Sequence, residues 1–400
     1  MNQPGCLVVP MRQTGIPPLM KTLQLYYATN RNHLGSDDKP LGYGTQFSED
    51  GIENLRFGYL ELDVDETVIA ANLAVDTGFG LGSGNKLAEA LTPLITNGGT
   101  RIEAFPEAVE ADKPDEAQSP ANFGSLAMFD ELKEAMMASN DVVIYIHGFN
   151  VSWSDAVASS LALQESLNQS DPGKPDQKVM VVLFSWPSDG KALPYVSYMS
   201  DRAEAKASGA ALGRGFLKAR DFLFKVRTHN ARGQDIACGQ DLHLLCHSMG
   251  NYALQCALER MSDYTPGGSF PRLFEHIFLC AADVDDNVLE DGQPMNDVHE
   301  LAHYVTAYSN KGDVAVFISH YTKGHPERLG HNGPARPALL HNKVHSVSCT
   351  PIVKGLIEHS YYQDGWVNQD IRFSIAGLEF DDPVRRRDRD RDLPNVWSMR

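Results

Sequence analysis

Ser248 is the residue whose setting most clearly suggests chemistry. It lies in the stretch DLHLLCHSMGNYALQCAL (residues 241–258), between the apolar run Leu242–Cys246 and a run of helix-forming residues that starts at Tyr252. A serine on a sharp turn between a strand and a helix is the nucleophile pattern written G-x-S-x-G. Gly250 fills the second glycine position, and Cys246, a small residue, replaces the first. The stretch predicts that Ser248 is an activated nucleophile.

A serine that attacks an acyl carbon also needs donors for the oxyanion that forms. Two backbone N–H groups usually supply them. The N–H of Met249, at the start of the expected helix, is one candidate. The apolar run Val142–Ile146 leads into His147-Gly148-Phe149-Asn150, and the N–H of Phe149 is the second candidate. Gly148 would let the backbone approach a ligand closely.

A general base and its orienting acid should follow the serine in the order Ser, Asp or Glu, His. Asp313 follows the apolar run Tyr304–Tyr308, and His359 follows the run Val344–Ser348. Ligands of open α/β sheets bind at the carboxyl ends of the strands, which is where both residues would lie. Asp283, after the run His276–Cys280, is an alternative acid that the sequence leaves open.

These residues need a scaffold of strands and helices to bring them together. Short apolar runs with little polar alternation are typical of parallel strands buried on both faces, and helical stretches between them indicate β-α-β units. The sequence therefore predicts an α/β fold with a mostly parallel, doubly wound sheet. The expected strands are 23–28, 57–64, 142–146, 179–184, 242–246, 276–280, 304–308 and 344–348, and the expected helices are 154–167, 203–227, 252–260 and 296–303.

Other segments mark the limits of the expected domain. We expect an N-terminal extension at 1–21, a single domain at 22–378 with an exposed acidic and proline-rich loop at 106–122, and a tail at 379–400. The tail contains RRRDRDRD, and this low complexity is typical of a disordered, solvated end. The glycine-rich segment GFGLGSG (78–84) matches neither the dinucleotide-binding fingerprint nor a phosphate-binding loop, so no phosphate is assigned to it.

Composition narrows the class of partner. The chain carries 35 Lys and Arg against 52 Asp and Glu, a net charge of −17, which argues against nucleic acid or an anionic membrane surface as the main partner. No apolar run approaches the roughly 20 residues of a membrane-spanning helix, and the N-terminus lacks the pattern of a signal peptide. The six cysteines are scattered. We expect a cytoplasmic protein that acts on a small-molecule acyl substrate without a metal or organic cofactor.

Seven motifs along the chain occur together in one known group. They are YATNR (27–31), YIHGFNVSW (145–153), FSWPSDG (184–190), CHSMGNYAL (246–254), AADVD (281–285), YSNKGDVA (308–315) and EHSYY (358–362). On these motifs the chain resembles an uncharacterised bacterial family of the α/β-hydrolase superfamily, over roughly residues 22–375. This resemblance implies a serine-hydrolase site with an esterase-like or lipase-like activity, and it implies no particular substrate.

Two alternative functions belong to other classes. HELAH (299–303) matches the zinc-peptidase pattern H-E-x-x-H, in which two histidines on one helical face bind zinc and the glutamate acts as base. However, His303 leads directly into the expected strand Tyr304–Tyr308, so the helix could not continue. The other alternative is a catalytically silent binding protein that retains the hydrolase fold.

Overall fold

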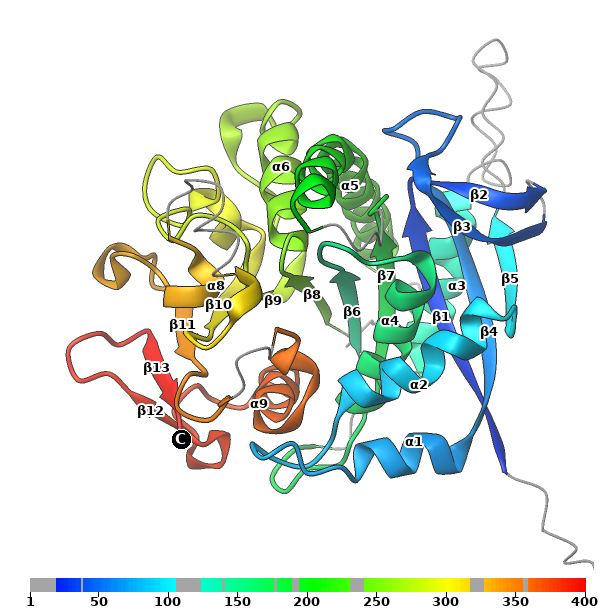
Figure 1. The fold of residues 1–400 in the computed structure, drawn as a ribbon. Coiled ribbons are helices and arrows are strands. Elements are labelled where there is room, and N and C mark those ends of the chain that lie inside the picture. Colours follow the sequence, from blue (N-terminus) through cyan, green and yellow to red (C-terminus); the bar gives the residue numbers. More distant parts are fainter. Residues whose placement is uncertain are drawn as a thin grey trace, which may run out of the picture.

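The computed structural model of this chain describes residues 19–36, 39–105, 124–138, 141–175, 178–188, 194–230, 241–316, 327–354 and 359–400. In these residues a twisted central sheet carries helices on both faces (Figure 1). The expected N-terminal extension lies outside the described residues except for its last three, two of which already belong to the first strand. The expected loop at 106–122 also lies outside them.

The central sheet is mostly parallel. Within the described residues it has eleven strands in the order β12-β13-β11-β10-β9-β8-β6-β7-β1-β4-β5. All neighbours from β13 to β1 pair in parallel, whereas β4, β5 and β12 pair antiparallel at the two edges. The strands are β1 (Met20–Thr29), β4 (Arg56–Asp65), β5 (Thr100–Phe105), β6 (Asp141–Ile146), β7 (Val179–Ser185), β8 (Leu242–His247), β9 (Phe274–Cys280), β10 (Ala302–Ser309), β11 (Val344–Ser348), β12 (Arg387–Arg389) and β13 (Val396–Met399). A separate hairpin joins β2 (Arg31–Ser36) to β3 (Lys39–Phe47).

Helices cover both faces of the sheet, so its central strands are buried on both sides. Neighbouring residues of β6 show this arrangement: Val143 belongs to the core on one face and Val142 to the core on the other, and both are fully buried. This burial on both sides explains why the strands read as nearly unbroken apolar runs. The first face carries α1 (Glu66–Leu73), α2 (Gly84–Thr96), α4 (Trp153–Leu167) and α9 (Gly365–Ile375), and the second carries α3 (Gly124–Ala138), α5 (Pro194–Asn230) and α6 (Gly250–Ser262) (Figure 1).

The doubly wound α/β fold that the sequence predicts is confirmed, with two local differences. Each of the eight expected strands lies within an observed one. The expected helix at 296–303 is wrong, because only Asn296–Glu300 is helical, as a short 3-10 segment, and β10 begins at Ala302. Within the described residues, no helix is both long and apolar enough to cross a membrane.

The prediction of a disordered tail at 379–400 is also wrong. Strand β13 pairs with β11 and extends the central sheet, and β12 pairs with β13. Arg385 and Arg387 are buried, and both contact the carboxylate of Asp370 on α9, at N–O distances of 2.9 and 3.3 Å. The charged composition of this segment therefore conceals a buried ion network and a pair of strands.

Replacement of Asp370 tests how much the buried network stabilises the fold. Burial favours the neutral acid, but Arg385 and Arg387 outweigh it, so the pKa of Asp370 lies below its ordinary value of 3.8. Asp370→Asn would leave two buried guanidinium groups without a counter-charge, and we expect it to lower the free energy of unfolding by about 3–5 kcal/mol at pH 7. Because the acid has a lowered pKa, its contribution is complete above about pH 4 and is lost as the pH falls further.

Urea denaturation followed by circular dichroism, at pH 7 and at pH 3, measures this difference. The control is Asp388→Asn, because Asp388 is exposed and pairs with the exposed Arg400 at 3.1 Å. An exposed pair of this kind contributes at most about 1 kcal/mol. Equal effects of the two substitutions at pH 7 would contradict the role given to Asp370.

Candidate active site

Ser248 occupies the sharp turn between β8 and α6. Its backbone is left-handed, with φ = 53°, a conformation that costs a residue with a side chain about 1–3 kcal/mol. Neighbouring backbone offsets this strain: the Ser248 N–H donates to the carbonyl of Cys280 at 3.0 Å, and the Ser248 carbonyl accepts from the N–H of Asp283 at 3.2 Å. The Asn251 amide donates to the same carbonyl at 3.0 Å. The turn is therefore fixed from three directions.

Close packing explains the two glycines around this turn. A Cβ added to Gly250 would lie 2.6 Å from the carbonyl oxygen of Ile146, so only glycine lets the start of α6 approach the end of β6. A Cβ added to Gly148 would lie 2.8 Å from the Cβ of Ser248. Cys246 replaces the missing glycine and is fully buried, and this burial raises the pKa of its thiol well above the ordinary value. Its side chain is a neutral packing group.

His359 and Asp313 form a hydrogen-bonded pair. Nδ1 of His359 lies 2.8 Å from Oδ2 of Asp313. The other carboxylate oxygen accepts from the N–H groups of Ala315 and Val316, so both oxygens of the fully buried Asp313 have partners. Because the carboxylate only accepts, Nδ1 of His359 carries the hydrogen and Nε2 is left as the basic atom.

The environment of His359 makes it a stronger base than an isolated histidine. Burial lowers its pKa, but the charge of Asp313 and its hydrogen bond raise it, and the charge of Asp283 adds to them. The net result is a pKa above the ordinary 6.5.

His247, next to Ser248 in the chain, supports His359. Its ring centroid lies 4.6 Å from that of His359, and its Nε2 lies 3.3 Å from the backbone carbonyl of the same residue. Burial lowers the pKa of His247 well below its ordinary value, with a smaller effect of the His359 charge, so the ring is neutral. His247 therefore links the Ser248 turn to the base and does not itself act as one.

Asp283 is near the site but is committed to other partners. One carboxylate oxygen accepts from the Tyr198 hydroxyl at 2.7 Å, and the other lies 3.2 Å from Nε of the buried Arg328. The hydrogen bond to His359 comes from Asp313 and not from Asp283. Of the two acids that sequence order left open, the geometry selects Asp313 as the partner of the histidine.

The candidate oxyanion donors are the N–H groups of the residue after Ser248 and of the residue after Gly148. Met249 is the residue before α6, and Phe149 follows Gly148, which packs against Ser248. Within the described part of the chain, neither the Phe149 nor the Met249 N–H donates a hydrogen bond. Two unsatisfied N–H groups beside a serine form the kind of arrangement that binds an oxyanion.

Arg31 is a residue whose part in the site sequence reasoning missed. It is fully buried at the start of β2, and its guanidinium donates to the carbonyls of Val151 and Gly44 at 2.8 and 2.9 Å and to the hydroxyl of Ser185 at 2.8 Å. Nη2 also lies 3.4 Å from Nε2 of His147. One buried cation thus holds both ends of the loop 147–151. The motif YATNR marked this position without indicating its role.

The loop 147–151 has further supports. The N–H of Asn150 donates to Asp201 at 3.0 Å, and Asp201 also accepts from the hydroxyl of Ser188 at 2.5 Å. The His147 ring stacks on Trp186, and burial, with a smaller effect of Arg31, lowers the His147 pKa to about 3. A neutral ring and several bonded backbone groups hold the loop in one conformation.

HELAH does not form a zinc-binding helix. His303 lies on β10 and contacts Glu275 at 2.9 Å, whereas His299 lies in the 3-10 segment and stacks on His341. The two histidines therefore do not share a helical face. In the part of the chain that the structure describes, no group of three His, Cys, Asp or Glu side chains could hold a metal ion.

A cleft of about 580 Å³ lies beside His359. His359 and Ser360 line it together with residues of α2, α4 and the loop before α2. Its charged lining residues are four acids and one base, namely Asp76, Glu89, Asp155, Asp364 and Lys86. The cleft therefore has an excess of negative charge next to the candidate base.

Comparisons with known proteins agree with this architecture. Residues 127–366 match a family described as an α/β-hydrolase of unknown function (DUF900). The match covers more than half of the chain, which therefore belongs to this α/β-hydrolase family. The resemblance predicted from the motifs is confirmed.

Individual similar proteins are more distant. An uncharacterised protein of Nostoc sp. (strain PCC 7120) is 29% identical over 141 residues, which are 31% of this chain and 32% of that protein. The chain thus matches about a third of the length of this curated relative. An esterase of Pyrobaculum calidifontis aligns with 10% identity and a TM-score of 0.27, over 62% of this chain and 76% of that chain.

Removal of the Asp313 charge tests the electrostatic coupling in the pair. Asp313→Asn keeps a side-chain oxygen that can accept from Ala315 and Val316 but removes the charge, so we expect the pKa of His359 to fall below 6.5. Because the wild-type pKa is raised, the pair stabilises the fold below about pH 6.5 and loses this effect as the pH rises through the folded pKa. NMR titration of the imidazole signals measures the shift.

Asp283→Asn is the comparison for this titration, because Arg328 would keep Asp285 as a counter-ion at 2.5 Å. It should lower the His359 pKa less than Asp313→Asn does. A larger shift from Asp283→Asn would reverse the assignment of the partner acid.

Proposed function

We propose that this protein is a serine hydrolase that cleaves carboxylic esters through an acyl-serine intermediate. The observation that carries the proposal is the His359–Asp313 hydrogen bond of 2.8 Å at the sheet edge where Ser248 occupies its left-handed turn. A nucleophile, a base and an orienting acid in this chain order are the parts that acyl transfer requires.

In the proposed first half-reaction, Nε2 of His359 removes the hydroxyl proton of Ser248 as Oγ bonds to the acyl carbon. The carbonyl oxygen becomes an oxyanion, which the N–H groups of Phe149 and Met249 stabilise. Asp313 keeps the Nδ1–H tautomer and stabilises the imidazolium that forms. The imidazolium then gives its proton to the leaving alcohol as the C–O bond breaks.

Water completes the proposed cycle. His359 removes a proton from the water, whose oxygen bonds to the acyl carbon, and the Ser248 oxygen leaves with the proton that the imidazolium returns. The products are an alcohol and a carboxylic acid, and the enzyme is restored. Every proton transfer uses the same nitrogen, so the position of the His359 ring governs both half-reactions.

The acidic cleft beside His359 narrows the substrate class. Four carboxylates against one lysine would repel an anionic acyl or alcohol group, since like charges placed together cost free energy. Neutral or cationic esters therefore suit this cleft better than anionic ones.

Replacement of Ser248 tests the proposal directly. Ser248→Ala should abolish both hydrolysis of p-nitrophenyl acetate and labelling by a fluorophosphonate, because no nucleophile remains. Alanine also fits the turn sterically, so the fold should be retained. Ser262→Ala, at the far end of α6 where the serine is exposed, is the matched control and should behave as wild type. Turnover by Ser248→Ala at the wild-type rate would contradict the assignment of Ser248 as the nucleophile.

The same experiment distinguishes the proposed serine hydrolase from the two alternative functions, a binding protein without activity and a zinc peptidase. A catalytically silent binding protein would leave even the wild type unlabelled. A zinc peptidase would keep its activity in Ser248→Ala and lose it in His299→Ala.

Arg31 is a positioning residue in this mechanism, since it holds the loop that carries the Phe149 N–H. Loss of one oxyanion donor costs about 10²–10³ in turnover, and a displaced donor should cost less. We expect Arg31→Lys, which keeps the charge but loses most of the hydrogen bonds, to lower kcat about 10–100-fold with KM changed less than threefold.

Steady-state kinetics and a thermal melt of Arg31→Lys measure these effects. The control is Lys21→Arg, which exchanges one basic residue for another at a half-exposed lysine of β1 that pairs with Glu165 of α4. A loss of melting temperature with unchanged kcat at 25 °C would show that Arg31 only stabilises the fold.

A further inference from the structure

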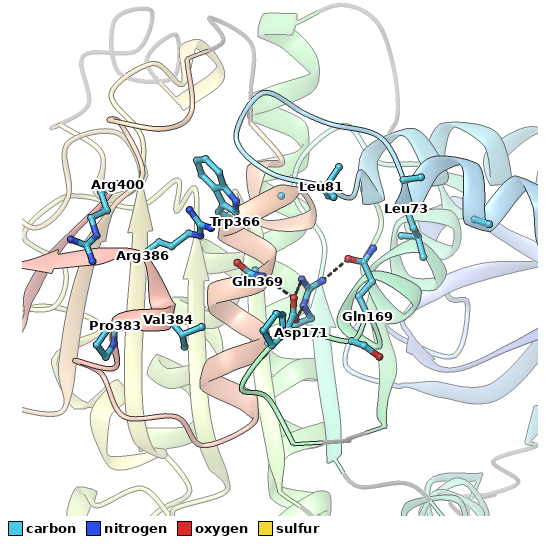
Figure 2. A pocket seen from close by; sticks show the side chains of 16 residues that line it. Leu73, Leu81, Gln169, Asp171, Trp366, Gln369, Pro383, Val384, Arg386 and Arg400 are labelled. Carbon is cyan, nitrogen blue, oxygen red and sulfur yellow. Dashed lines mark hydrogen bonds and ion pairs between the residues drawn. The ribbon is translucent and has the colours of Figure 1, made fainter.

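A second, larger cleft lies apart from His359. It has a volume of about 1180 Å³ and is lined by α1, α9, the loop after α4 and the C-terminal segment (Figure 2). His359 lines the acidic cleft and not this one. The two clefts share no lining residue, and the glycine-rich loop 76–83 contributes to both.

Gly80 of that loop and Gly365 of α9 allow the loop to pack directly on the start of α9, which carries Trp366. A Cβ added to Gly80 would lie 2.6 Å from the Trp366 ring, and one added to Gly365 would lie 2.4 Å from the carbonyl oxygen of Phe79. The N–H of Trp366 donates to the same carbonyl at 2.8 Å. The segment GFGLGSG therefore forms a wall between the clefts and fixes the position of the Trp366 side chain.

Arg386 brings an available positive charge into the large cleft. Its guanidinium carbon lies 4.9 Å from the centroid of the Trp366 ring, and Figure 2 shows the two side chains together. Within the described residues, Arg386 makes no ion pair. The buried Arg372, by contrast, is paired with Asp171 through two of its nitrogens.

Arg400 adds a second cation at the rim. Its N–H donates to the carbonyl of Arg386 at 2.9 Å, so the two residues are neighbours just beyond the paired ends of β12 and β13. Its side chain pairs with Asp388 at 3.1 Å, and both side chains are more than half exposed. Exposed pairs are weak, so a ligand anion can compete for Arg400.

The rest of the lining is mixed, with an aliphatic side formed by α1 and the glycine-rich loop and a polar part that consists of Gln169, Ser170, Asp171, Gln369 and Arg372. Leu81 projects from the glycine-rich loop and is 66% exposed, an unusual position for a large apolar side chain. Opposite the arginines lie the residues of α1 that line the cleft, and Figure 2 shows Leu73 and Leu81 on this side. The aliphatic lining residues are Ala70, Leu73, Ala74, Leu81 and Val384, with Pro172 and Pro383 beside them.

We propose that this cleft binds an alkyl carboxylate of medium chain length. The carboxylate accepts paired hydrogen bonds from the Arg386 guanidinium, which the face of Trp366 holds in place, with Arg400 as a second contact. The alkyl chain lies along Leu73 and Leu81 and shields them from water. The chain has a net charge of −17, so an anion needs a local pair of cations such as Arg386 and Arg400 in order to bind. The acidic cleft beside His359 would repel the same anion.

Binding is measured on the Ser248→Ala protein, so the result does not depend on any hydrolytic activity. The probes are decanoate, decanol and decyltrimethylammonium, each below its aggregation concentration. Trp366 is the partly exposed tryptophan, whereas Trp153, Trp186 and Trp397 are buried. Protection of tryptophan fluorescence from acrylamide quenching therefore reports occupancy of this cleft, and calorimetry gives Kd.

We expect decanoate to protect Trp366 and to bind at least tenfold more tightly than decanol or decyltrimethylammonium. Shortening the chain to octanoate should weaken binding, by up to about fourfold for each methylene removed. Arg386→Gln should weaken decanoate binding about tenfold. The matched control is Arg389→Gln, because Arg389 lies over the ring of Trp397 in the same segment and does not line the cleft.

Equal affinity for decanoate and decanol, or an unchanged Kd in Arg386→Gln, would overturn the proposal. Equal weakening of decanoate binding in Arg386→Gln and Arg389→Gln would also overturn the proposal. It would show that decanoate is attracted by the overall positive charge of this segment and not by Arg386 in particular. Loss of fluorophosphonate labelling in the wild type would leave this result untouched, since the assay needs no nucleophile.

Discussion

The left-handed backbone of Ser248 is the constraint on which the rest of the site depends. A residue with a side chain adopts φ = 53° only where its surroundings impose it, and here hydrogen bonds to residues at and just beyond the end of β9 do so. The Ser248 N–H donates to Cys280 at the end of β9, and its carbonyl accepts from Asp283 just beyond that strand. The serine hydroxyl, the Met249 N–H and the approach of Gly148 all follow from this one turn. A change in the register between β8 and β9 would displace all three.

Buried arginines fix the positions of other segments around the Ser248 turn, although these segments are far apart in the sequence. Arg31 holds the loop 147–151, Arg328 holds Asp283, and Arg385 holds Asp370 on α9, the helix that follows the His359 segment. Each of these arginines is fully buried in a chain whose net charge is −17. Arginine suits this use because its planar group offers five donors and stays charged when it is buried. In the described interior these arginines fix the positions of a loop, an acid and a helix.

Much of the scaffold could be predicted from sequence because burial on both faces leaves a strong pattern. Runs such as Val142–Ile146 are apolar throughout, and their order along the chain placed Ser248, Asp313 and His359 at one sheet edge. The choice between Asp313 and Asp283 could not be made in this way. Both acids follow strands. The structure distinguishes them because Asp313 bonds to His359, whereas Arg328 and Tyr198 occupy the carboxylate of Asp283. The roles of these residues in catalysis remain predictions.

The C-terminal segment shows why its charged composition led to a wrong prediction of disorder. Its residues alternate between buried and exposed positions, as those of an ordered segment do. In Arg385–Asp388 the first and third residues are buried and the second and fourth are exposed. Arg385 ends a short 3-10 segment, Arg386 has a left-handed backbone with φ = 51°, and β12 begins at Arg387. The alternation could not be seen in the sequence because every position is ionic. The carboxylate that neutralises the inward arginines belongs to Asp370 on α9, 15 residues before Arg385. The same alternation that buries Arg385 and Arg387 turns Arg386 outward onto Trp366. The segment therefore stabilises the sheet with one set of its arginines and presents a cation to the large cleft with the other.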